Sequence, residues 1–289
     1  MKIAVFMGGI SSEREVSLWS GAAILESLQK QGYDAYGVDV NEKNLITAFT
    51  DNEYDLAYLA LHGGYGENGT FQGLLDMLGK PYTGSGAMES AVTMDKAYTK
   101  AIAQIAGIKT ARTYNSVEEI SEYPVVVKPS RDGSSVGIYF CNTAQEVREA
   151  LKALEGRKPL IEEMISGEEL TVGVLNGEGL GVLRIVPQKN KFYDYESKYA
   201  AGGSTHEFPA KIEKKAYDKA LENAVKIHKI IGLKGISRSD FMLKDGEVYF
   251  LEVNTCPGMT KTSLVPDLGT LKGYTFDDLV KIMVDTFKK

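Results

Sequence analysis

The chain of 289 residues is long enough for about two domains of ordinary size, or for three small ones. Hydrophobic residues make up 43% and charged residues 25%, a composition typical of globular proteins that bury a core of their own. Lys and Arg number 33 against 39 Asp and Glu, and this net charge of −6 argues against a surface devoted to nucleic acid. Cys141 and Cys256 lie far apart, which excludes a zinc site built on paired cysteines and favours a reducing compartment.

The sequence offers no segment that would carry the chain into or across a membrane. Only five apolar residues, Ile3 to Met7, precede the first glycines and charges, which is too few for a secretion signal. No stretch approaches the roughly 18 apolar residues that a spanning helix requires. We therefore expect a cytoplasmic protein that does not bind membranes.

The first third of the chain alternates between short apolar strands and helices. We expect strands at 3–7, 35–40 and 56–61, and a helix with Val16 to Leu28 at helical spacing that ends at Gly32. Continuous apolar strands that alternate with helices predict a parallel sheet covered on both faces.

The rest of the chain shows two further patterns of helices and strands. Between 84 and 164 we expect helices at 91–107 and 144–154 and strands at 125–128, 138–140 and 160–163. Beyond that come β-rich runs at 169–186 and 247–253 and a helix at 216–231. These changes predict three units, covering 1–84, 85–164 and 165–289.

Two groups of polar residues follow strands of the first unit. Glu13 lies just beyond the first strand, where open α/β sheets bind ligands, and it could hold an ammonium group or simply favour a helix N-terminus. Its glycines lack GxGxxG spacing, so a dinucleotide site is poorly supported. His62 begins HGGYGENG, whose four glycines indicate close backbone approach to a ligand, although a hydrogen-bonded loop histidine is the alternative.

The segment from Lys128 to Gly137 is the strongest local indication of phosphate binding. A lysine closes a strand, and the Gly/Ser-rich turn that follows can point several backbone N–H groups at an anion. The GxxxxGK[ST] pattern is absent, so this is not a Walker A loop. A plain hairpin turn would not need the lysine, the serines and both glycines together.

Oxygen ligands recur near the C-terminus. Strand alternation places Arg238 with Asp240 on one face, and Glu252 with Asn254 on one face of the next strand. If these strands form a hairpin, Asp240, Glu252 and Asn254 converge as hard oxygen ligands, which suits magnesium. A solvated charged face is the alternative, but the neighbouring Phe, Met and Leu residues indicate burial, where unpaired carboxylates are costly.

Taken together, these segments resemble the D-alanine–D-alanine ligases of the ATP-grasp superfamily. The resemblance runs from Met1 to the C-terminal helix and is carried, in the family's order, by GGISSEREVSLWSG, LHGGYGENGTFQG, PYTGSG, MDK, VVVKPSRDGSSVG, FYDYESKY, SRSDFML and FLEVNTCPGMTKTSLVP. It implies an α/β protein: an N-terminal Rossmann-like parallel-sheet domain (1–84) that binds substrate, then a two-domain ATP-grasp fold. The central domain (85–164) and the C-terminal domain (165–289), which carries the metal site, would hold ATP between them.

The resemblance also implies a reaction and partners. ATP would convert the carboxylate of one D-alanine to an acyl phosphate, and the amine of a second D-alanine would displace the phosphate, for peptidoglycan precursor synthesis in the cytoplasm. The expected assembly is a homodimer, with no nucleic-acid or membrane partner.

Nucleotide and metal roles are transferred residue by residue. The resemblance implies that Lys96, Lys128, the Ser134–Gly137 loop with Ser135, and Lys198 lie at the ATP phosphates. Glu162, Glu163, Met164 and Ile165 would form the hinge that reads adenine, and Glu169 would bind the ribose. Asp240, Glu252 and Asn254 would hold two Mg²⁺ ions, with Mn²⁺ as a substitute. Glu163 and Met164 depart from the lysine and aromatic residue of some members, which barely affects a hinge that reads adenine through its backbone.

Substrate roles are transferred in the same way. The resemblance implies that Glu13 holds the ammonium group of the first D-alanine, with His62 near its carboxylate. Arg238 and the Gly258 N–H would stabilise the tetrahedral oxyanion, and Ser263 and Leu264 would receive the second carboxylate. Tyr199, with Glu13 and Ser134, would lock the Phe192–Tyr199 loop closed.

Four other functions compete with this interpretation. A D-alanine–D-lactate ligase shares the fold and the metal site, but the Lys198–Tyr199 pair resembles the dipeptide-forming type. Another ATP-grasp carboxylate–amine ligase would require a different N-terminal pocket. A nicotinamide-dependent oxidoreductase would leave the cluster from Arg238 to Asn254 unused. A non-catalytic nucleotide-binding regulator would not need the complete set of metal and phosphate ligands.

Overall fold

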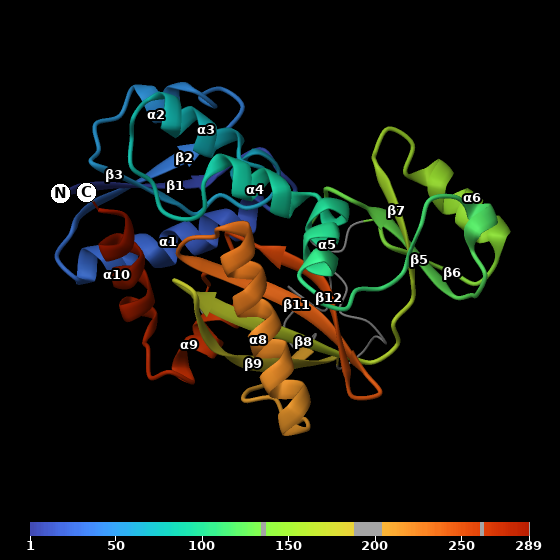
Figure 1. The fold of residues 1–289 in the computed structure, drawn as a ribbon. Helices are drawn as coiled ribbons and strands as arrows, with labels where there is room; N and C mark the ends of the chain where they lie inside the picture. Colours follow the sequence, from blue (N-terminus) through green and yellow to red (C-terminus); the bar gives the residue numbers. More distant parts are fainter. Residues whose placement is uncertain (134–136, 188–203, 261–262, 289) are drawn as a thin grey trace.

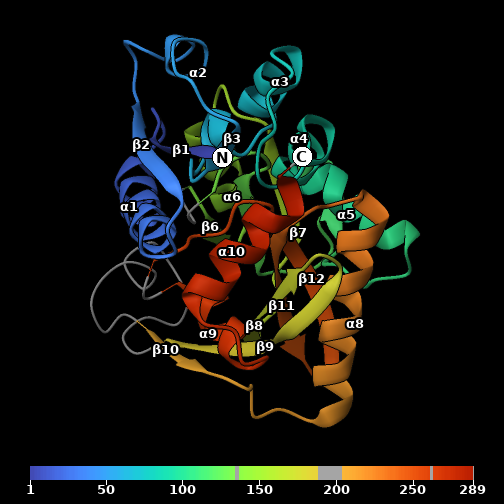
Figure 2. The same ribbon diagram turned by 90° about the vertical axis from the view of Figure 1, so that its left-hand side faces the viewer.

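The computed structural model describes residues 1–133, 137–187, 204–260 and 263–288. Within these residues the strands form three sheets in succession along the chain (Figures 1 and 2). The first is parallel with strand order β2-β1-β3, the second is antiparallel with order β4-β7-β5-β6, and the third is antiparallel with order β10-β9-β8-β11-β12. The expected fold class, a parallel α/β sheet followed by a mixed α and β part, is confirmed.

The N-terminal sheet is covered on both faces, as its apolar strands predict. Its elements are β1 (Lys2–Gly8), α1 (Arg14–Lys30), β2 (Asp34–Val40), α2 (Thr47–Thr50), β3 (Leu56–Leu59), η1 (Gly64–Gly66) and α3 (Thr70–Met77). Along β1, Ile3 and Val5 belong to the core formed with α1, while Phe6 stacks on Phe49 of α2 at 4.4 Å between ring centroids. Alternate side chains of one strand thus fill two cores.

The central unit contains α4 (Ala87–Met94), α5 (Lys96–Ile105), β4 (Thr113–Tyr114), η2 (Val117–Glu119), β5 (Val125–Pro129), β6 (Tyr139–Cys141), α6 (Ala144–Ala153) and β7 (Pro159–Glu163). The single helix expected over 91–107 is wrong, because the chain becomes extended at Asp95, with φ −92° and ψ 103°. The Asp95 side chain accepts a hydrogen bond from the Ala97 N–H and so caps α5, a position that aspartate favours.

The C-terminal unit contains β8 (Glu168–Leu175), β9 (Glu178–Pro187), β10 (Ser204–Glu207), α8 (Lys214–Ile231), β11 (Ile236–Lys244), β12 (Glu247–Asn254), α9 (Leu264–Thr270) and α10 (Phe276–Phe287). The expected hairpin is present, with β11 antiparallel to β12. Asp245 and Gly246 form its turn at φ 52° and 78°, the left-handed conformation that two-residue hairpin turns require.

The two ends of the chain pack together. One hydrophobic core joins Ile24 and Leu28 of α1 to Val280 and Val284 of α10, and Figure 1 shows these helices side by side. The Ser27 hydroxyl donates to Asp277 at 2.7 Å across this contact. The N-terminal sheet is therefore held directly against the C-terminal unit, while the boundaries at 84/85 and 164/165 stay a prediction.

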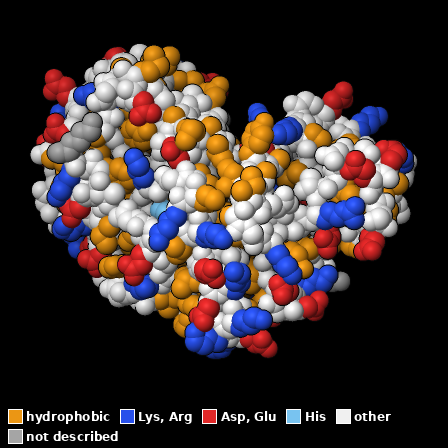
Figure 3. Space-filling view, viewed as in Figure 1, with side chains coloured by type: hydrophobic (Ala, Val, Ile, Leu, Met, Phe, Trp, Pro, Cys, Tyr) orange, Lys and Arg blue, Asp and Glu red, His pale blue; other side chains and the backbone are white. Residues whose placement is uncertain are grey.

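The surface agrees with the composition of the chain. Figure 3 shows basic and acidic side chains interspersed over one face, whose outline is notched between the N-terminal and central units. Across the described ranges, the helices are all too short or too polar to cross a bilayer.

Candidate active site

A cavity of about 780 Å³ lies between the central and the C-terminal sheet. This volume is within the range that encloses a small-molecule ligand. The strands of both sheets contribute its wall, together with Lys96 at the start of α5. The wall includes many residues expected to bind nucleotide or metal: Lys96, Lys128, Glu162, Glu163, Met164, Ile165, Glu169, Asp240 and Glu252.

Two lysines enter this cavity from different elements. Lys96 Nζ lies 3.0 Å from Glu252 Oε2 and 2.6 Å from the Asp132 carbonyl oxygen. Lys128 Nζ lies 2.7 Å from Glu162 Oε2. Burial, and then repulsion from Lys96, lowers the pKa of Lys128 to about 8. The structure therefore brings together two cations that could neutralise a bound phosphate.

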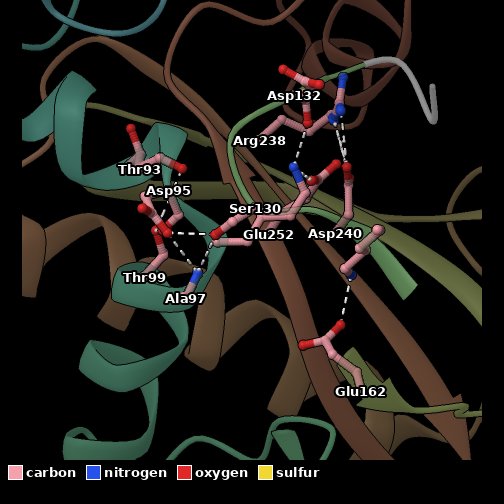
Figure 4. Close-up of polar contacts among 12 residues, drawn as sticks. Thr93, Asp95, Ala97, Thr99, Ser130, Asp132, Glu162, Arg238, Asp240 and Glu252 are labelled. Atoms are coloured by element: carbon pink, nitrogen blue, oxygen red, sulfur yellow. Dashed lines mark hydrogen bonds and ion pairs between the residues drawn. The ribbon is translucent and has the colours of Figure 1, made fainter. Parts of the chain in front are cut away.

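Asp95 ties three segments of the site together. It is 2% exposed, and its carboxylate accepts a hydrogen bond from Ser130 Oγ at 2.6 Å (Figure 4). It also accepts hydrogen bonds from Arg131 Nε at 2.8 Å and Lys158 Nζ at 3.1 Å. Burial opposes its ionisation, but these three donors prevail and lower its pKa to about 2. Asp95 thus fixes the start of α5, the entry to the Gly/Ser loop and the residue before β7.

The expected metal ligands lie on the β11–β12 hairpin. Asp240 is opposite Glu252 in the strand register, and Arg238 is opposite Asn254. The Arg238 guanidinium donates two hydrogen bonds to Asp240, from Nε to Oδ1 at 3.1 Å and from Nη2 to Oδ2 at 2.9 Å (Figure 4). The Thr171 hydroxyl also donates to Asp240 Oδ1 at 2.6 Å, an interaction that the sequence did not indicate.

Asp240, Glu252 and Asn254 could bind a divalent cation, but they supply only part of its coordination shell. Asp240 and Glu252 supply carboxylate oxygens to the cavity wall, and Asn254 Oδ1 accepts a hydrogen bond from the Cys256 N–H at 2.7 Å. Hard oxygen donors in this number suit Mg²⁺, which usually takes its remaining ligands from water and substrate phosphates. Over the part of the chain that the structure describes, no group of three or more His, Cys, Asp or Glu residues could hold a metal by itself.

Glu13 lies where the N-terminal unit meets the cavity. It is 9% exposed and immediately precedes α1. A Cβ atom added to Gly133 would lie 3.2 Å from Glu13 Oε1, and one added to Gly63 would lie 3.2 Å from Oε2. Gly133 also lines the cavity. Glycines in both loops therefore let the backbone approach this carboxylate closely.

His62 joins the N-terminal unit to the loop after β12. Its Nδ1–H donates to the Cys256 carbonyl oxygen at 3.0 Å, and its Nε2 lies 2.9 Å from Ser20 Oγ. The same hydroxyl accepts a hydrogen bond from the Met259 N–H at 3.2 Å. His62 is 5% exposed, so this contact is buried next to Gly258.

The remaining residues of the C-terminal unit that are expected to bind substrate lie close together. A Cβ atom added to Gly258 would lie 3.0 Å from Ser263 Oγ, which accepts a hydrogen bond from the Thr260 N–H at 2.9 Å. Leu264 is buried at the first position of α9. Ser134, Ser135, Lys198, Tyr199 and the expected Phe192–Tyr199 loop lie outside the described residues.

Lys100 is a buried site residue that the sequence interpretation missed. It lies one helical turn after Lys96 on α5, is 2% exposed and forms an ion pair with Glu162. The spacing of the two lysines in MDKAYTK was the available indication, because residues four apart share a face of a helix.

A ligand-sized cavity between two sheets, with lysines and carboxylates on its wall, is the architecture of a nucleotide-dependent enzyme. Family models for the D-ala D-ala ligase N-terminus and C-terminus match residues 44–85 and 95–285. A D-alanine–D-alanine ligase of Fusobacterium nucleatum is 66% identical over 99% of both chains, and one of Agrobacterium fabrum is 47% identical over 98% of this chain and 96% of its own. The chain belongs to the D-alanine–D-alanine ligase family.

Solved structures agree with this assignment. The D-alanine–D-alanine ligase of Bacillus anthracis complexed with ATP is 31% identical, with a TM-score of 0.86 over 99% of this chain and 97% of its own. The VanG D-Ala:D-Ser ligase of Enterococcus faecalis is 29% identical, with a TM-score of 0.85 over 99% and 98%. The expected ATP-grasp fold is thus confirmed, and the same fold serves ligases with different second substrates.

Proposed function

We propose that this protein is an ATP-dependent ligase that joins two D-alanine molecules into D-alanyl-D-alanine, a building block of peptidoglycan. The observation that carries the proposal is the convergence of Lys96, Lys128, Asp240 and Glu252 on one cavity wall. Phosphoryl transfer needs cations and a metal site around the transferred group, and this wall provides residues for both. The 66% identity to the F. nucleatum ligase supports D-alanine as the substrate.

Nucleotide binding would use two groups of residues. Lys96 and Lys128 would contact the phosphates, together with Ser134, Ser135 and Lys198. The hinge of Glu162, Glu163, Met164 and Ile165 would contact adenine, and Glu169 would bind the ribose. The B. anthracis relative with ATP bound supports a nucleotide in this fold.

Metal binding would use Asp240, Glu252 and Asn254, and two Mg²⁺ ions or Mn²⁺ would supply charge neutralisation during phosphoryl transfer. Arg238 and Lys96 hold the two carboxylates in place in the structure. Thr171 restricts Asp240 further, so the ligand oxygens are oriented by the protein itself.

The proposed substrate residues would serve the two steps of the reaction. A carboxylate oxygen of the first D-alanine attacks the γ-phosphorus of ATP, and ADP leaves. The amine of the second D-alanine then attacks the acyl carbon, so a C–N bond forms, phosphate leaves and the amine releases its proton. Glu13 and His62 would hold the first D-alanine, Arg238 and the Gly258 N–H the oxyanion, and Ser263 and Leu264 the second carboxylate. Tyr199 would close the loop and exclude water.

Three further properties belong to this proposal. The chain would divide into domains at 1–84, 85–164 and 165–289, assemble as a homodimer and act in the cytoplasm. Light scattering of the purified protein tests the assembly, since a homodimer has twice the mass of one chain.

ADP release in the presence of different substrates tests the proposed reaction. We expect release with D-alanine to exceed release with L-alanine at least tenfold, and D-alanyl-D-alanine to be the product. Mixtures of D-alanine with D-lactate or D-serine separate the alternatives, because the amine or hydroxyl that attacks appears in the product. A mixed product as the main species would contradict the assignment of the second substrate.

A further inference from the structure

Lys128 on β5 and Lys100 on α5 share one buried carboxylate, that of Glu162. Glu162 on β7 is 2% exposed, and its Oε2 lies 2.7 Å from Lys128 Nζ. Its Oε1 pairs with Lys100 Nζ, which reaches it from α5. Lys100, Glu162 and Lys128 therefore form a buried row in which a single carboxylate bridges two lysines.

The two lysines of this row differ in what they can reach. Lys128 and Glu162 line the cavity, whereas Lys100 lies behind Glu162 and is not part of the wall. Because Lys100 is not part of the wall and pairs with Glu162, it would affect a bound phosphate only through that carboxylate.

We infer that Lys100 is a positioning residue, which holds the Glu162 carboxylate and thereby leaves the Lys128 ammonium available to the phosphates of ATP. This inference rests on the proposed nucleotide site. Without Lys100, the buried Glu162 carboxylate would have Lys128 as its remaining ion-pair partner, since a buried charge without a partner is costly. Glu162 and the ATP phosphates would then compete for the same ammonium group.

A double-mutant cycle tests this role, with ATP·Mg²⁺ affinity measured by calorimetry in the full chain. We expect Lys100→Met to weaken ATP binding about tenfold, within the range of coupling between residues in one network. In kinetics the KM for ATP should rise while the KM for D-alanine stays unchanged. In a Glu162→Gln background, Lys100→Met should weaken ATP binding less than twofold, because Lys100 acts through that carboxylate.

The cycle separates this role from simple packing. A packing role predicts the same loss in both backgrounds, and that result would overturn the inference, as would unchanged ATP affinity in Lys100→Met. If Lys100→Met does not fold, Lys100→Gln keeps a donor for Glu162 while removing the charge. It should weaken ATP binding about threefold, and wild-type affinity in Lys100→Gln would equally overturn the inference.

Two reference variants complete the experiment. Lys109 follows α5, is exposed and pairs with Glu247, so Lys109→Met should leave ATP affinity unchanged. Lys128→Met should weaken ATP binding at least as much as Lys100→Met. If Lys128→Met weakens ATP binding but Lys100→Met does not, the positioning role alone is refuted. If Lys128→Met leaves ATP affinity unchanged, the proposed nucleotide site is refuted as well.

Discussion

Asp240 and Glu252 lie opposite each other across the β11–β12 hairpin, and each pairs with a basic side chain. Arg238 on the same strand grips Asp240, while Lys96 reaches Glu252 from the start of α5. The hairpin therefore connects the expected metal ligands to the expected phosphate-binding lysine. This connection makes the two carboxylates the first target for mutation.

Asp240→Asn and Glu252→Gln should each lower the rate of ADP release with D-alanine by at least about 100-fold, because losing one negative ligand weakens metal binding. Both variants keep the size of the side chain, and circular dichroism should show an unchanged fold. Glu247→Gln is the matched control, because Glu247 lies on the same hairpin, at its exposed end beside the turn. Near-normal turnover in both site variants would contradict the metal assignment.

Asp95→Asn should destabilise the protein by roughly 2 kcal/mol, as expected for buried hydrogen bonds to charged groups. Asparagine keeps the helix cap but loses the charge that Arg131 and Lys158 contact. Urea unfolding measures the change. Arg148→Met removes an exposed ion pair with Glu118 and should cost less than about 1 kcal/mol. Equal losses in the two variants would show that Asp95 is not an anchor.

ATP affinity should fall as pH rises through about 8. The pKa of Lys128 is lowered to about 8, so its ammonium loses the proton well below the ordinary lysine value of about 10.4. Phosphate favours the charged form, and ATP binding near that pH should therefore be accompanied by proton uptake. Calorimetry in buffers of different ionisation enthalpy measures this uptake. Proton uptake that persists in Lys128→Met would assign it to another group.

Acid should destabilise the fold through His228 on α8. Burial, and then Lys229, lowers the pKa of His228 to about 4, whereas an unfolded histidine has a pKa near 6.5. Between these values the unfolded chain takes up a proton that the folded protein does not, so stability falls as pH drops from about 6.5 to 4. The loss from this residue amounts to about 3 kcal/mol. His228→Gln should flatten that part of the stability curve, and an unchanged slope would contradict the assignment.

The strands and most helices could be predicted because their patterns are local. The alternation on either side of Asp245 and Gly246 predicts the hairpin, and the strands from Ile3 onward predict the parallel sheet. The helix over 91–107 was wrong for a non-local reason. Asp95 interrupts it, and the partners of its carboxylate, Ser130 and Lys158, come from segments far away in the sequence.

The site was predictable where a residue type and a spacing define a chemistry. Lys128 in its Gly/Ser segment and Asp240 with Glu252 on neighbouring strands are such cases. Lys100 and Thr171 were missed, because their roles depend on which buried side chains they meet after folding. A lysine on a helix is usually solvated, so its sequence context alone favoured the surface.

The most direct test of the central claim follows oxygen atoms from D-alanine labelled with ¹⁸O in its carboxylate. Activation of the carboxylate by ATP moves one of these oxygens to phosphorus, and attack by the second amine releases it with the phosphate. We predict one ¹⁸O in every phosphate released and one in the new peptide carbonyl, measured by mass spectrometry. Phosphate that carries no label while D-alanyl-D-alanine accumulates would contradict the account.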